Sequence, residues 1–414
     1  MSDVRAFTSA ATPARTTRLR SRETEGAAFP RFVTITLMFS LPLIVGLSVI
    51  LAPLEALDVL LVTLFALNTL WVAAAAATAL IGVAQDDQPK NSPPIAWTPK
   101  ARTAVLFLIC GEDPLDVARR MSELHRGLVR AGQTDVTDIW LLSDTPNAKA
   151  QPEESAIARL RDDEAIRYRR RTENTARKPG NIANWIDTFG APYTSMLIMD
   201  ADSTVTVERL NTLRYKMERA PRLGLLQSGI ALRPGATRFA RLQRLSARLT
   251  GPVYIRGLKA WSGATGNYWG HNALIRLDAF REVMRLPRLS GPAPFGGDFL
   301  SHDFIEAAML VRNGWDVEIM PETHGSSEAG PEDLESFHRR DRRWCQGNLQ
   351  HLRPLFSGAV HPISRIHLAS GIQSYLSSPI WLTLMLLFLL AGMAPGAVPV
   401  LSGALALLLV PKLA

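Results

Sequence analysis

The distribution of apolar residues divides this chain into membrane-like and soluble parts. Residues 32–54 and 59–84 carry no charged side chain, and each exceeds the roughly 20 residues that a helix needs to cross a bilayer. A third uncharged stretch, 368–411, is interrupted near 393–399 by two prolines and a glycine. It predicts one full span and the beginning of another. Buried helices of a soluble protein are rarely this long and apolar, so we expect transmembrane helices.

Between these stretches the pattern is that of an α/β protein. Short apolar runs, each of buried-strand character, alternate with helical periodicity, which predicts a mostly parallel sheet with helices on both faces. The basic amphipathic segment 238–255 fits packing against the core or the membrane surface. The predicted strands are 103–110, 136–142, 195–199 and 223–228, and the predicted helices between and after them end near 131, 162, 188 and 220.

Charge places these parts relative to the membrane. Residues 1–31 hold six arginines against three acids and few large apolar side chains, so we expect a disordered cytoplasmic tail. Two spans, within 32–84, then return the chain to the cytoplasm. A proline-rich linker, 85–102, leads to a cytoplasmic domain, 103–365. The remainder, 366–414, predicts an interfacial helix and membrane helices, and the sequence stops inside a span.

Composition narrows the class of partner. The net charge of +8 suits anionic lipid or a phosphorylated substrate, and the chain has no recognisable nucleic-acid-binding module, so no nucleic acid is expected. The chain has only two cysteines, Cys110 and Cys345, which is consistent with a reducing compartment. They lie far apart in sequence and make no metal-site pattern.

Acidic residues recur where predicted strands end. Asp200 and Asp202 follow the strand 195–199, Asp144 follows 136–142, and Glu112 with Asp113 follows 103–110. Carboxylate oxygens are the ligands that Mg²⁺ and Mn²⁺ prefer, often shared with substrate phosphates. An Asp-x-Asp tripeptide alone also occurs in turns and at helix starts. The recurrence at one edge of a sheet, where α/β proteins bind ligands, favours a ligand site.

These motifs resemble those of the processive inverting glycosyltransferases of the cellulose-synthase type, which have a GT-A fold. Longer runs resemble, more specifically, the inner-membrane synthases of osmoregulated periplasmic glucans. Arg340 stands where the broader superfamily has Gln. The matching pieces are Asp144, Asp200-Ala201-Asp202, Ser301-His302-Asp303 and Arg340-Asp341-Arg342-Arg343-Trp344, and the longer runs are 177–181, 268–273, 300–304 and 340–345.

The resemblance implies a role for each of these residues. Asp303 is the expected general base, in the first turn of a helix that Ser301 begins. Asp200 and Asp202 are expected to bind a divalent cation, Mg²⁺ or Mn²⁺. The nucleotide sugar is expected at Asp144, Lys178, Asn181, Asp200, Arg340 and Arg343, and the acceptor at Gly270, His271, Asn272 and Trp344.

Each assignment has a plainer alternative. Asp303 also suits the helix dipole, and Trp344 also suits a helix core. His271 and His302 also fit as buried, satisfied histidines. The arginines of the basic run 167–178 also read as a solvated surface.

Together these features predict a multi-pass bacterial inner-membrane glucosyltransferase. The resemblance implies UDP-glucose as donor, inversion to a β-linked product, a β-1,2 glucan backbone, and the growing glucan and the lipid bilayer as partners. It also admits acyl carrier protein as a partner. Two alternatives stay open, a synthase of another β-glycan or glycolipid, and a membrane-bound nucleotide-sugar sensor without turnover.

Overall fold

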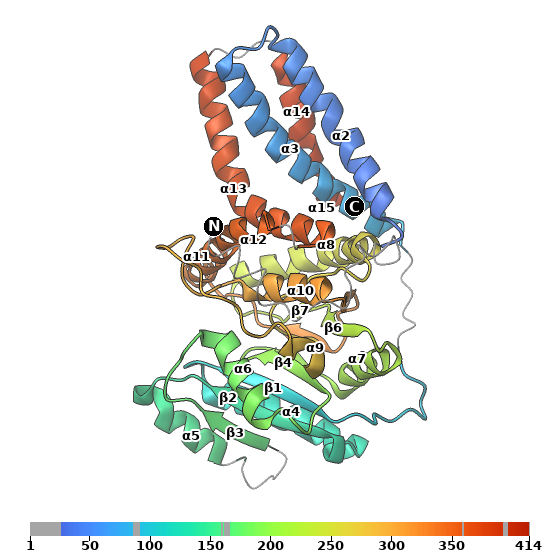
Figure 1. The fold of residues 1–414 in the computed structure, drawn as a ribbon, viewed down its shortest axis with the longest axis vertical. Coiled ribbons are helices and arrows are strands. Elements are labelled where there is room, and N and C mark those ends of the chain that lie inside the picture. The colour runs from blue at the N-terminus through green and yellow to red at the C-terminus, as the bar shows by residue number, and fades with distance from the viewer. Residues whose placement is uncertain are drawn as a thin grey trace.

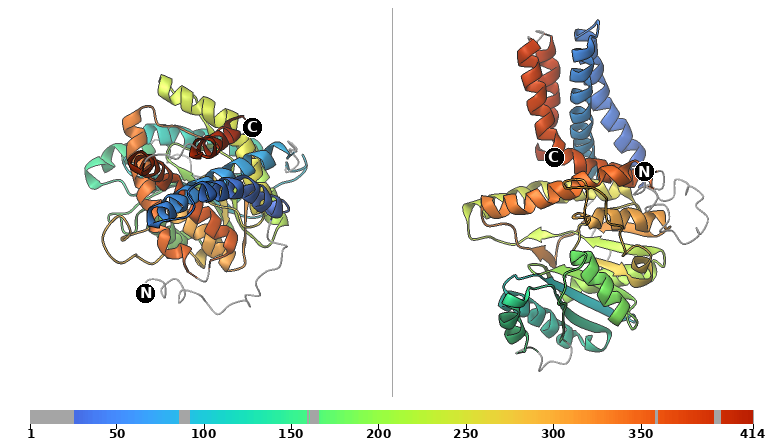
Figure 2. Two further views of the ribbon diagram at one scale, coloured as in Figure 1. Left: turned by 90° about the horizontal axis from the view of Figure 1, so that it is seen from above. Right: turned by 60° about the vertical axis from the view of Figure 1, so that its left-hand side comes forward.

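The computed structural model describes residues 26–85, 92–158, 160, 166–357, 360–391 and 396–413. An upright bundle of apolar helices stands on an α/β body, and the two parts meet at a layer of helices that lie across the body (Figures 1 and 2). The predicted disordered tail lies outside the described residues except for its last few positions. The linker is described only in part.

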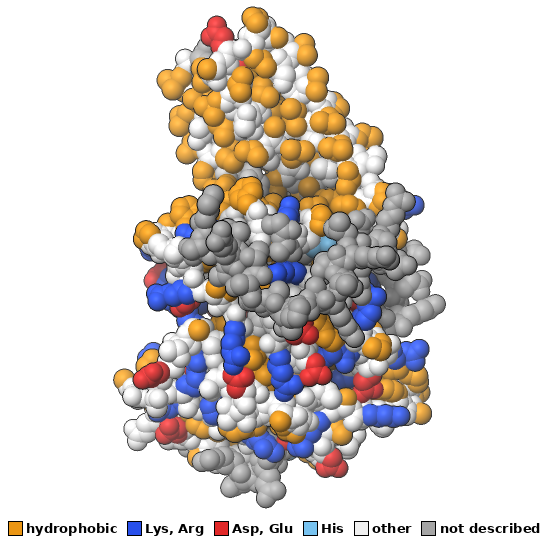
Figure 3. Space-filling model, in the orientation of Figure 1, with side chains coloured by type: hydrophobic (Ala, Val, Ile, Leu, Met, Phe, Trp, Pro, Cys, Tyr) orange, Lys and Arg blue, Asp and Glu red, His pale blue; other side chains and the backbone are white. Residues whose placement is uncertain are grey.

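The apolar helices match the predicted spans. Three are long and apolar enough to cross a membrane: α2 (Phe29–Ile50), α3 (Ala56–Val83) and α13 (Pro362–Ala391). Figure 3 shows hydrophobic side chains covering this part, whereas Lys, Arg, Asp and Glu gather on the body below it. Two shorter helices follow, α14 (Ala397–Leu407) and α15 (Val410–Leu413). The exposed apolar surface is what a lipid environment would cover.

The buried Asn68 side chain inside the bundle is hydrogen-bonded to a neighbouring helix. The buried Asn68 side chain of α3 donates to the Ser377 carbonyl of α13 at 3.0 Å and accepts from Gln373 Nε2 at 2.7 Å. Unpaired polar groups are costly in hydrocarbon, so these bonds fix how α3 and α13 face each other.

A seven-stranded sheet with the order β3-β2-β1-β4-β8-β6-β9 forms the centre of the body. All its neighbouring strands pair in parallel except β8, which is antiparallel to β4 and β6. The apolar runs form its central strands because both faces of the sheet are covered. The strands are β1 (Thr103–Ile109), β2 (Thr137–Ser143), β3 (Ile166–Arg170), β4 (Ser195–Asp200), β6 (Leu223–Ser228), β8 (Ala273–Arg276) and β9 (Asp316–Met320).

Helices cover both faces of this sheet, as predicted. On one face Trp185, Phe280 and Ile305 form a buried cluster with the strands, and on the other Met121 and Leu213 do so. The first face carries α6 (Arg177–Phe189), α9 (Leu277–Arg281) and α10 (His302–Arg312), and the second carries α4 (Pro114–Ala131) and α7 (Val207–Arg219). Asp113 accepts from Leu115 N as the α4 cap, so this predicted ligand candidate has a structural role.

The layer between body and bundle contains α8 (Arg238–Ser262), α11 (Leu334–Gln350) and α12 (Leu352–Leu355). Gly82 of α3 lies against the backbone of Val253 and Gly257 in α8, and Gly257 lies against the Thr78 carbonyl. A side chain at either glycine would overlap the opposing backbone. A small sheet with the order β5-β10-β7 joins Thr204–Val205, Ser326–Glu328 and Ala231–Leu232.

Three details differ from the sequence-based expectation. Strand β3 occupies part of the basic run 167–178, where no strand is predicted, and β8 and β9 are likewise additional. Helix α8 continues to Ser262, beyond the predicted end at residue 255. Helix α5 (Ala150–Ala158) begins before the expected start at Glu153, and its predicted end at residue 162 lies outside the described residues.

Candidate active site

Strands β1, β2 and β4 end together at one edge of the sheet. Leu108 pairs with Asp200, and Ile109 pairs with Ser143, so Asp144 and Asp200 lie on either side of the end of β1. Asp200 is the last residue of β4, and a tight turn follows in which Ser203 N donates to the Asp200 carbonyl. The predicted convergence of acidic strand ends is therefore present.

Lys178 brings a cation to this edge. It is the second residue of α6, and its ammonium group forms an ion pair with Asp200 Oδ1. The chain enters α6 through Ala176 and Arg177, both with positive φ (53° and 51°), which is uncommon for non-glycine residues. A strained turn at this point is therefore what directs the start of α6 toward Asp200.

The two carboxylates of the Asp-x-Asp motif differ in their electrostatics. Burial by itself would raise the pKa of Asp200, but Lys178 and then His271 outweigh it and bring the pKa to about 2. Burial and the neighbouring Asp200 carboxylate raise the pKa of Asp202. A second positive charge near Asp202 would therefore be favourable, as a bound cation would supply.

Asp144 forms an ion pair with Arg171, a residue that none of the sequence motifs marks. Arg171 donates from Nε and Nη2 to the two Asp144 oxygens, each at 2.7 Å, and both side chains are largely buried. Arg171 also donates to the carbonyls of Thr175 and Arg177, which ties the turn before α6 to the end of β2. Its position at the end of β3, next to the end of β2, is visible only in the fold, because no strand is predicted in the basic run.

Asp303 approaches the same region from α10. It lies in the first turn of the helix, and Ser301 occupies the N-cap position without a side-chain cap bond. Gly270, with φ +86°, lies so close that a Cβ atom there would be 3.4 Å from Asp303 Oδ2. Burial raises the pKa of Asp303; His302 opposes this effect and Glu306 adds to it. A raised pKa suits a group that must accept a proton.

His271 connects the Asp-x-Asp turn to the small sheet. Its Nδ1 lies 3.1 Å from Ser203 Oγ, and its Nε2 lies 3.3 Å from Glu328 Oε2. Glu328 belongs to the three-residue strand β10, and nothing in the local sequence marks it. His271 is therefore a partnered histidine placed beside the predicted metal ligands.

Two predicted ligand-binding side chains are buried instead. The Asn272 side chain is 1% exposed and donates to Ser326 Oγ at 2.8 Å and to the Thr204 carbonyl at 3.3 Å. Asn181 is equally buried within the first turns of α6. The Asn272 side chain therefore joins the residue after His271 to the small sheet, and the contacts of Asn272 with the acceptor and of Asn181 with the nucleotide stay predictions.

Helix α11 carries the arginine and tryptophan pair. The Arg340 guanidinium lies over the Trp344 ring at 4.5 Å from its centroid, and Trp344 is 41% exposed, so it is not a core residue. Arg343 helps to lower the pKa of Asp200, which places its charge toward the β4 edge. It also lines a basic hollow of about 510 Å³ together with Arg177.

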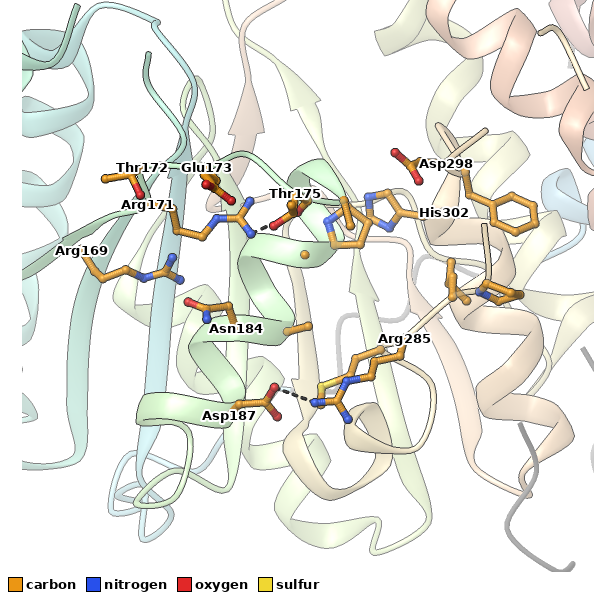
Figure 4. Close-up of a pocket in the computed structure, with 18 of the residues that line it drawn as sticks. Arg169, Arg171, Thr172, Glu173, Thr175, Asn184, Asp187, Arg285, Asp298 and His302 are labelled. Atoms are coloured by element: carbon orange, nitrogen blue, oxygen red, sulfur yellow. Dashed lines mark hydrogen bonds and ion pairs between the residues drawn. The ribbon is translucent and has the colours of Figure 1, made fainter. Parts of the chain in front are cut away.

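A second cavity lies beside α6. It encloses about 680 Å³ between the end of β3, α6 and the segment that precedes α10 (Figure 4). Asp187 and Arg285 form an ion pair of 2.7 Å across it, and Arg171 and His302 are among its lining residues. The cavity therefore adjoins the candidate site through the residue that precedes Asp303.

The donor set fits a hard divalent cation. Among the described residues there is no group of three or more His, Cys, Asp or Glu side chains suited to a metal. Two adjacent carboxylates, Asp200 and Asp202, nevertheless match the way Mg²⁺ is bound by one or two carboxylates plus substrate phosphates and water. A cation here would depend on the substrate for the rest of its ligands.

These features define a glycosyltransferase. The chain belongs to the glycosyl transferase family group 2, whose profile matches residues 196–410. The fold is also similar to that of a mannosyltransferase from Pyrobaculum calidifontis, solved with GDP-Man and Mn²⁺, with a TM-score of 0.54 at 15% identity over 86% of this chain and 98% of that one. This similarity confirms the GT-A type of fold.

Among curated proteins the chain is similar to glucans biosynthesis glucosyltransferase H. It is 42% identical to that protein of Bradyrhizobium diazoefficiens over 347 residues, which cover 81% of this chain and 46% of the relative. It is 41% identical to that of Xanthomonas campestris pv. campestris over 343 residues, 80% of this chain and 53% of the relative. The chain thus spans about half the length of the curated relatives it matches.

Proposed function

We propose that this protein transfers glucose from UDP-glucose, with inversion and with the help of a divalent cation, to a growing β-linked glucan. The relatives' shared name supports a glucan product, and the resemblance in the motifs supports the β-1,2-linked backbone of osmoregulated periplasmic glucans. The observation that carries the proposal is the convergence of Lys178, Asp200 and Asp202 at one strand edge with Asp303 beside Gly270.

The residues divide the chemistry between leaving group and nucleophile. Lys178 and Arg343 supply positive charge for the departing diphosphate, where negative charge develops. A divalent cation bound by Asp200 and Asp202 would neutralise that diphosphate further. Asp303 accepts the proton of the acceptor hydroxyl as its oxygen attacks the sugar C1. A single displacement of this kind inverts the configuration at C1.

Trp344 and Arg340 present a flat surface for the acceptor. An exposed aromatic ring can stack on a sugar face, and the guanidinium on its other side holds the ring in place. The main chain of Gly270 and the partnered His271 would complete this side of the site. Asp144 with Arg171 would meet the nucleoside end of the donor.

The membrane helices would hold the enzyme where the product must cross. The bundle is proposed to span the bacterial inner membrane several times, with the α/β body on the cytoplasmic side, where UDP-glucose is made. The arginine-rich segment before α2 supports this orientation. Acyl carrier protein stays a proposed partner on the resemblance alone.

Incorporation of label from radiolabelled UDP-glucose into glucan tests the proposal. Membrane vesicles with the native chain are expected to incorporate label when Mg²⁺ or Mn²⁺ is present, and vesicles with Asp303→Asn are expected to lose at least ~100-fold in rate, a typical contribution of a general base. Linkage analysis of the product checks the β-1,2 assignment.

Equal incorporation by the two proteins would overturn Asp303 as base. Incorporation by neither, with intact binding of UDP-glucose, would favour a sensor without turnover. An exposed carboxylate on the far side of the body, changed in Asp135→Asn, is the matched control and should leave the rate unchanged.

A further inference from the structure

A buried ionisable pair lies directly beneath the proposed base. His302 Nδ1 is 3.0 Å from Glu306 Oε2, and the two side chains are 8% and 1% exposed. Burying a charged pair costs desolvation energy that an apolar pair of similar volume would not. Packing alone therefore does not explain this pair, and its location in α10 suggests a role in the chemistry of Asp303.

The helix brings the pair and the base together. Residues three and four apart lie on the same face of a helix, so Glu306 is a neighbour of both Asp303 and His302. The charges of Glu306 and Asp303 also act on Tyr268, raising the pKa of its buried hydroxyl. Within the described part of the chain that hydroxyl has no hydrogen-bond partner. Asp303, Glu306 and Tyr268 are thus near enough for the two carboxylates to act on the buried hydroxyl.

The His302 side of the pair opens on water. His302 lines the 680 Å³ cavity beside α6, and Figure 4 shows it at the edge of that cavity, opposite Arg169 and Arg171. Of the described residues that line this cavity, none is Asp200, Asp202 or Asp303. The cavity thus adjoins the candidate site without including the carboxylates at the β4 edge or the base, and His302, which precedes Asp303 in α10, is the residue of this helix that lines it.

We propose that Glu306 and His302 form a proton relay that returns Asp303 to its ionised state after each transfer by releasing the proton into this cavity. The inference rests on the proposed role of Asp303. In the transfer step the acceptor O–H bond breaks, the O–C1 bond forms and the C1–O bond to the diphosphate breaks, with the proton going to Asp303. Asp303 then passes the proton to the Glu306 carboxylate. His302, which is protonated in the ion pair, releases its own proton to water and then accepts the proton from Glu306, which restores the pair.

Such a route has a clear use in a polymerising enzyme. While nucleoside diphosphate and product fill the site, water has little access to Asp303 from that side. His302 is suited to accept the proton, because the ion pair with Glu306 raises the pKa of His302 against the effect of burial. Asp303 raises it further, and Lys178 of α6 lowers it. Arg169, Arg171 and Asp298 are charged residues that line the cavity with His302.

Loss of the relay should slow turnover and leave donor binding intact. Glu306→Gln and His302→Ala are expected to lower kcat by at least ~10-fold, at the low end of general acid–base contributions, with the KM for UDP-glucose within about twofold of native. Glu123→Gln, at an exposed position of α4, is the matched control and should have native kcat.

Chemical rescue separates a relay from a structural role. Free imidazole can enter the enlarged cavity of His302→Ala and take over the last step, so it should raise kcat about tenfold and saturably, and it should not rescue Asp303→Asn. Failure of imidazole to raise kcat in folded His302→Ala would overturn the relay, even if Glu306→Gln does not fold. Native kcat in His302→Ala and Glu306→Gln would overturn it too. In both cases an inactive Asp303→Asn protein would leave the proposed base standing, whereas an active one would remove the base and the relay together.

Discussion

The two sides of the candidate site handle charge in opposite ways. On the donor side, Asp144 and Asp200 each have a cationic partner, Arg171 and Lys178, and the pKa of Asp200 is about 2. On the acceptor side, Asp303 is buried next to another carboxylate, Glu306, and its pKa is raised. On the donor side Asp200 thus stays ionised, and its cationic partner can be exchanged for a charged ligand. The acceptor side is built to take up and release a proton.

The largest effect should come from the Asp-x-Asp motif. Asp202→Asn removes one of the two carboxylates that would hold the cation, and Asp200 is already paired with Lys178, so cation-dependent binding of UDP-glucose should be abolished. Calorimetric titration with Mn²⁺, with and without chelator, measures this directly. Asp135→Asn is the control. Cation-dependent binding that survives in Asp202→Asn would show that the donor side does not use this motif for metal.

A smaller effect, confined to the acceptor side, should follow from Gly270→Ala. The new Cβ would lie 3.4 Å from Asp303 Oδ2, at the limit of ordinary van der Waals contact, so it would shift the carboxylate only slightly. The positive φ of +86° adds strain of about 1–3 kcal/mol. Because even a shift of about 1 Å costs ~100-fold in rate, we expect kcat to fall by less than about 10-fold while the KM for UDP-glucose stays near native.

The chain offers a close control for this change. Gly314, at the end of the same helix as Asp303, has φ +88° with no atom within 4 Å of a Cβ position. Gly314→Ala therefore carries a similar backbone strain without the contact to the base. Equal kcat in the two variants would mean that strain alone, and not the position of Asp303, explains the Gly270 result.

The smallest effect is a displacement of the pH profile. Asp303 must be ionised to act as a base, and a raised pKa means that it becomes protonated at a higher pH than an ordinary aspartate. As the pH falls, kcat at saturating donor should therefore decline along an acid limb above the ordinary value of 3.8, while Asp200 stays ionised until about pH 2. An acid limb at or below 3.8 would contradict the raised pKa of Asp303.

Elements that depend on neighbouring residues in the sequence could be predicted from it, whereas elements that depend on pairing between distant segments could not. Strand β1 and helix α7 lie within a residue of their predicted bounds, because apolar runs and helical spacing are local signals. Strand β3 was missed because it is an edge strand made mostly of arginine and tyrosine, which looks like a basic surface run. The antiparallel insertion of β8 depends on pairing with β4 and β6, which no local pattern encodes.

The site shows the same division. Asp200 and Asp202 were predicted from a recognisable strand end, and Asp303 mainly from the resemblance to a family motif; their roles stay predictions. Glu328 was not predicted, because only the folded chain brings it to His271. Asn272 was predicted from its place in a conspicuous motif; the structure adds that its side chain donates to Thr204 and Ser326, which no local pattern indicated.

The contact between Gly82 and Gly257 has a mechanical consequence. Because α3 and α8 touch backbone to backbone there, neither helix can slide or roll without separating from the other. The thickness of the surrounding bilayer sets the tilt of a spanning helix. A change in lipid thickness that tilts α3 would therefore move α8 as well, and the short segment after α8 leads to Gly270 beside Asp303. The position of Gly270 relative to Asp303 should therefore depend on membrane thickness. The rate of the enzyme should then vary with acyl-chain length in defined vesicles.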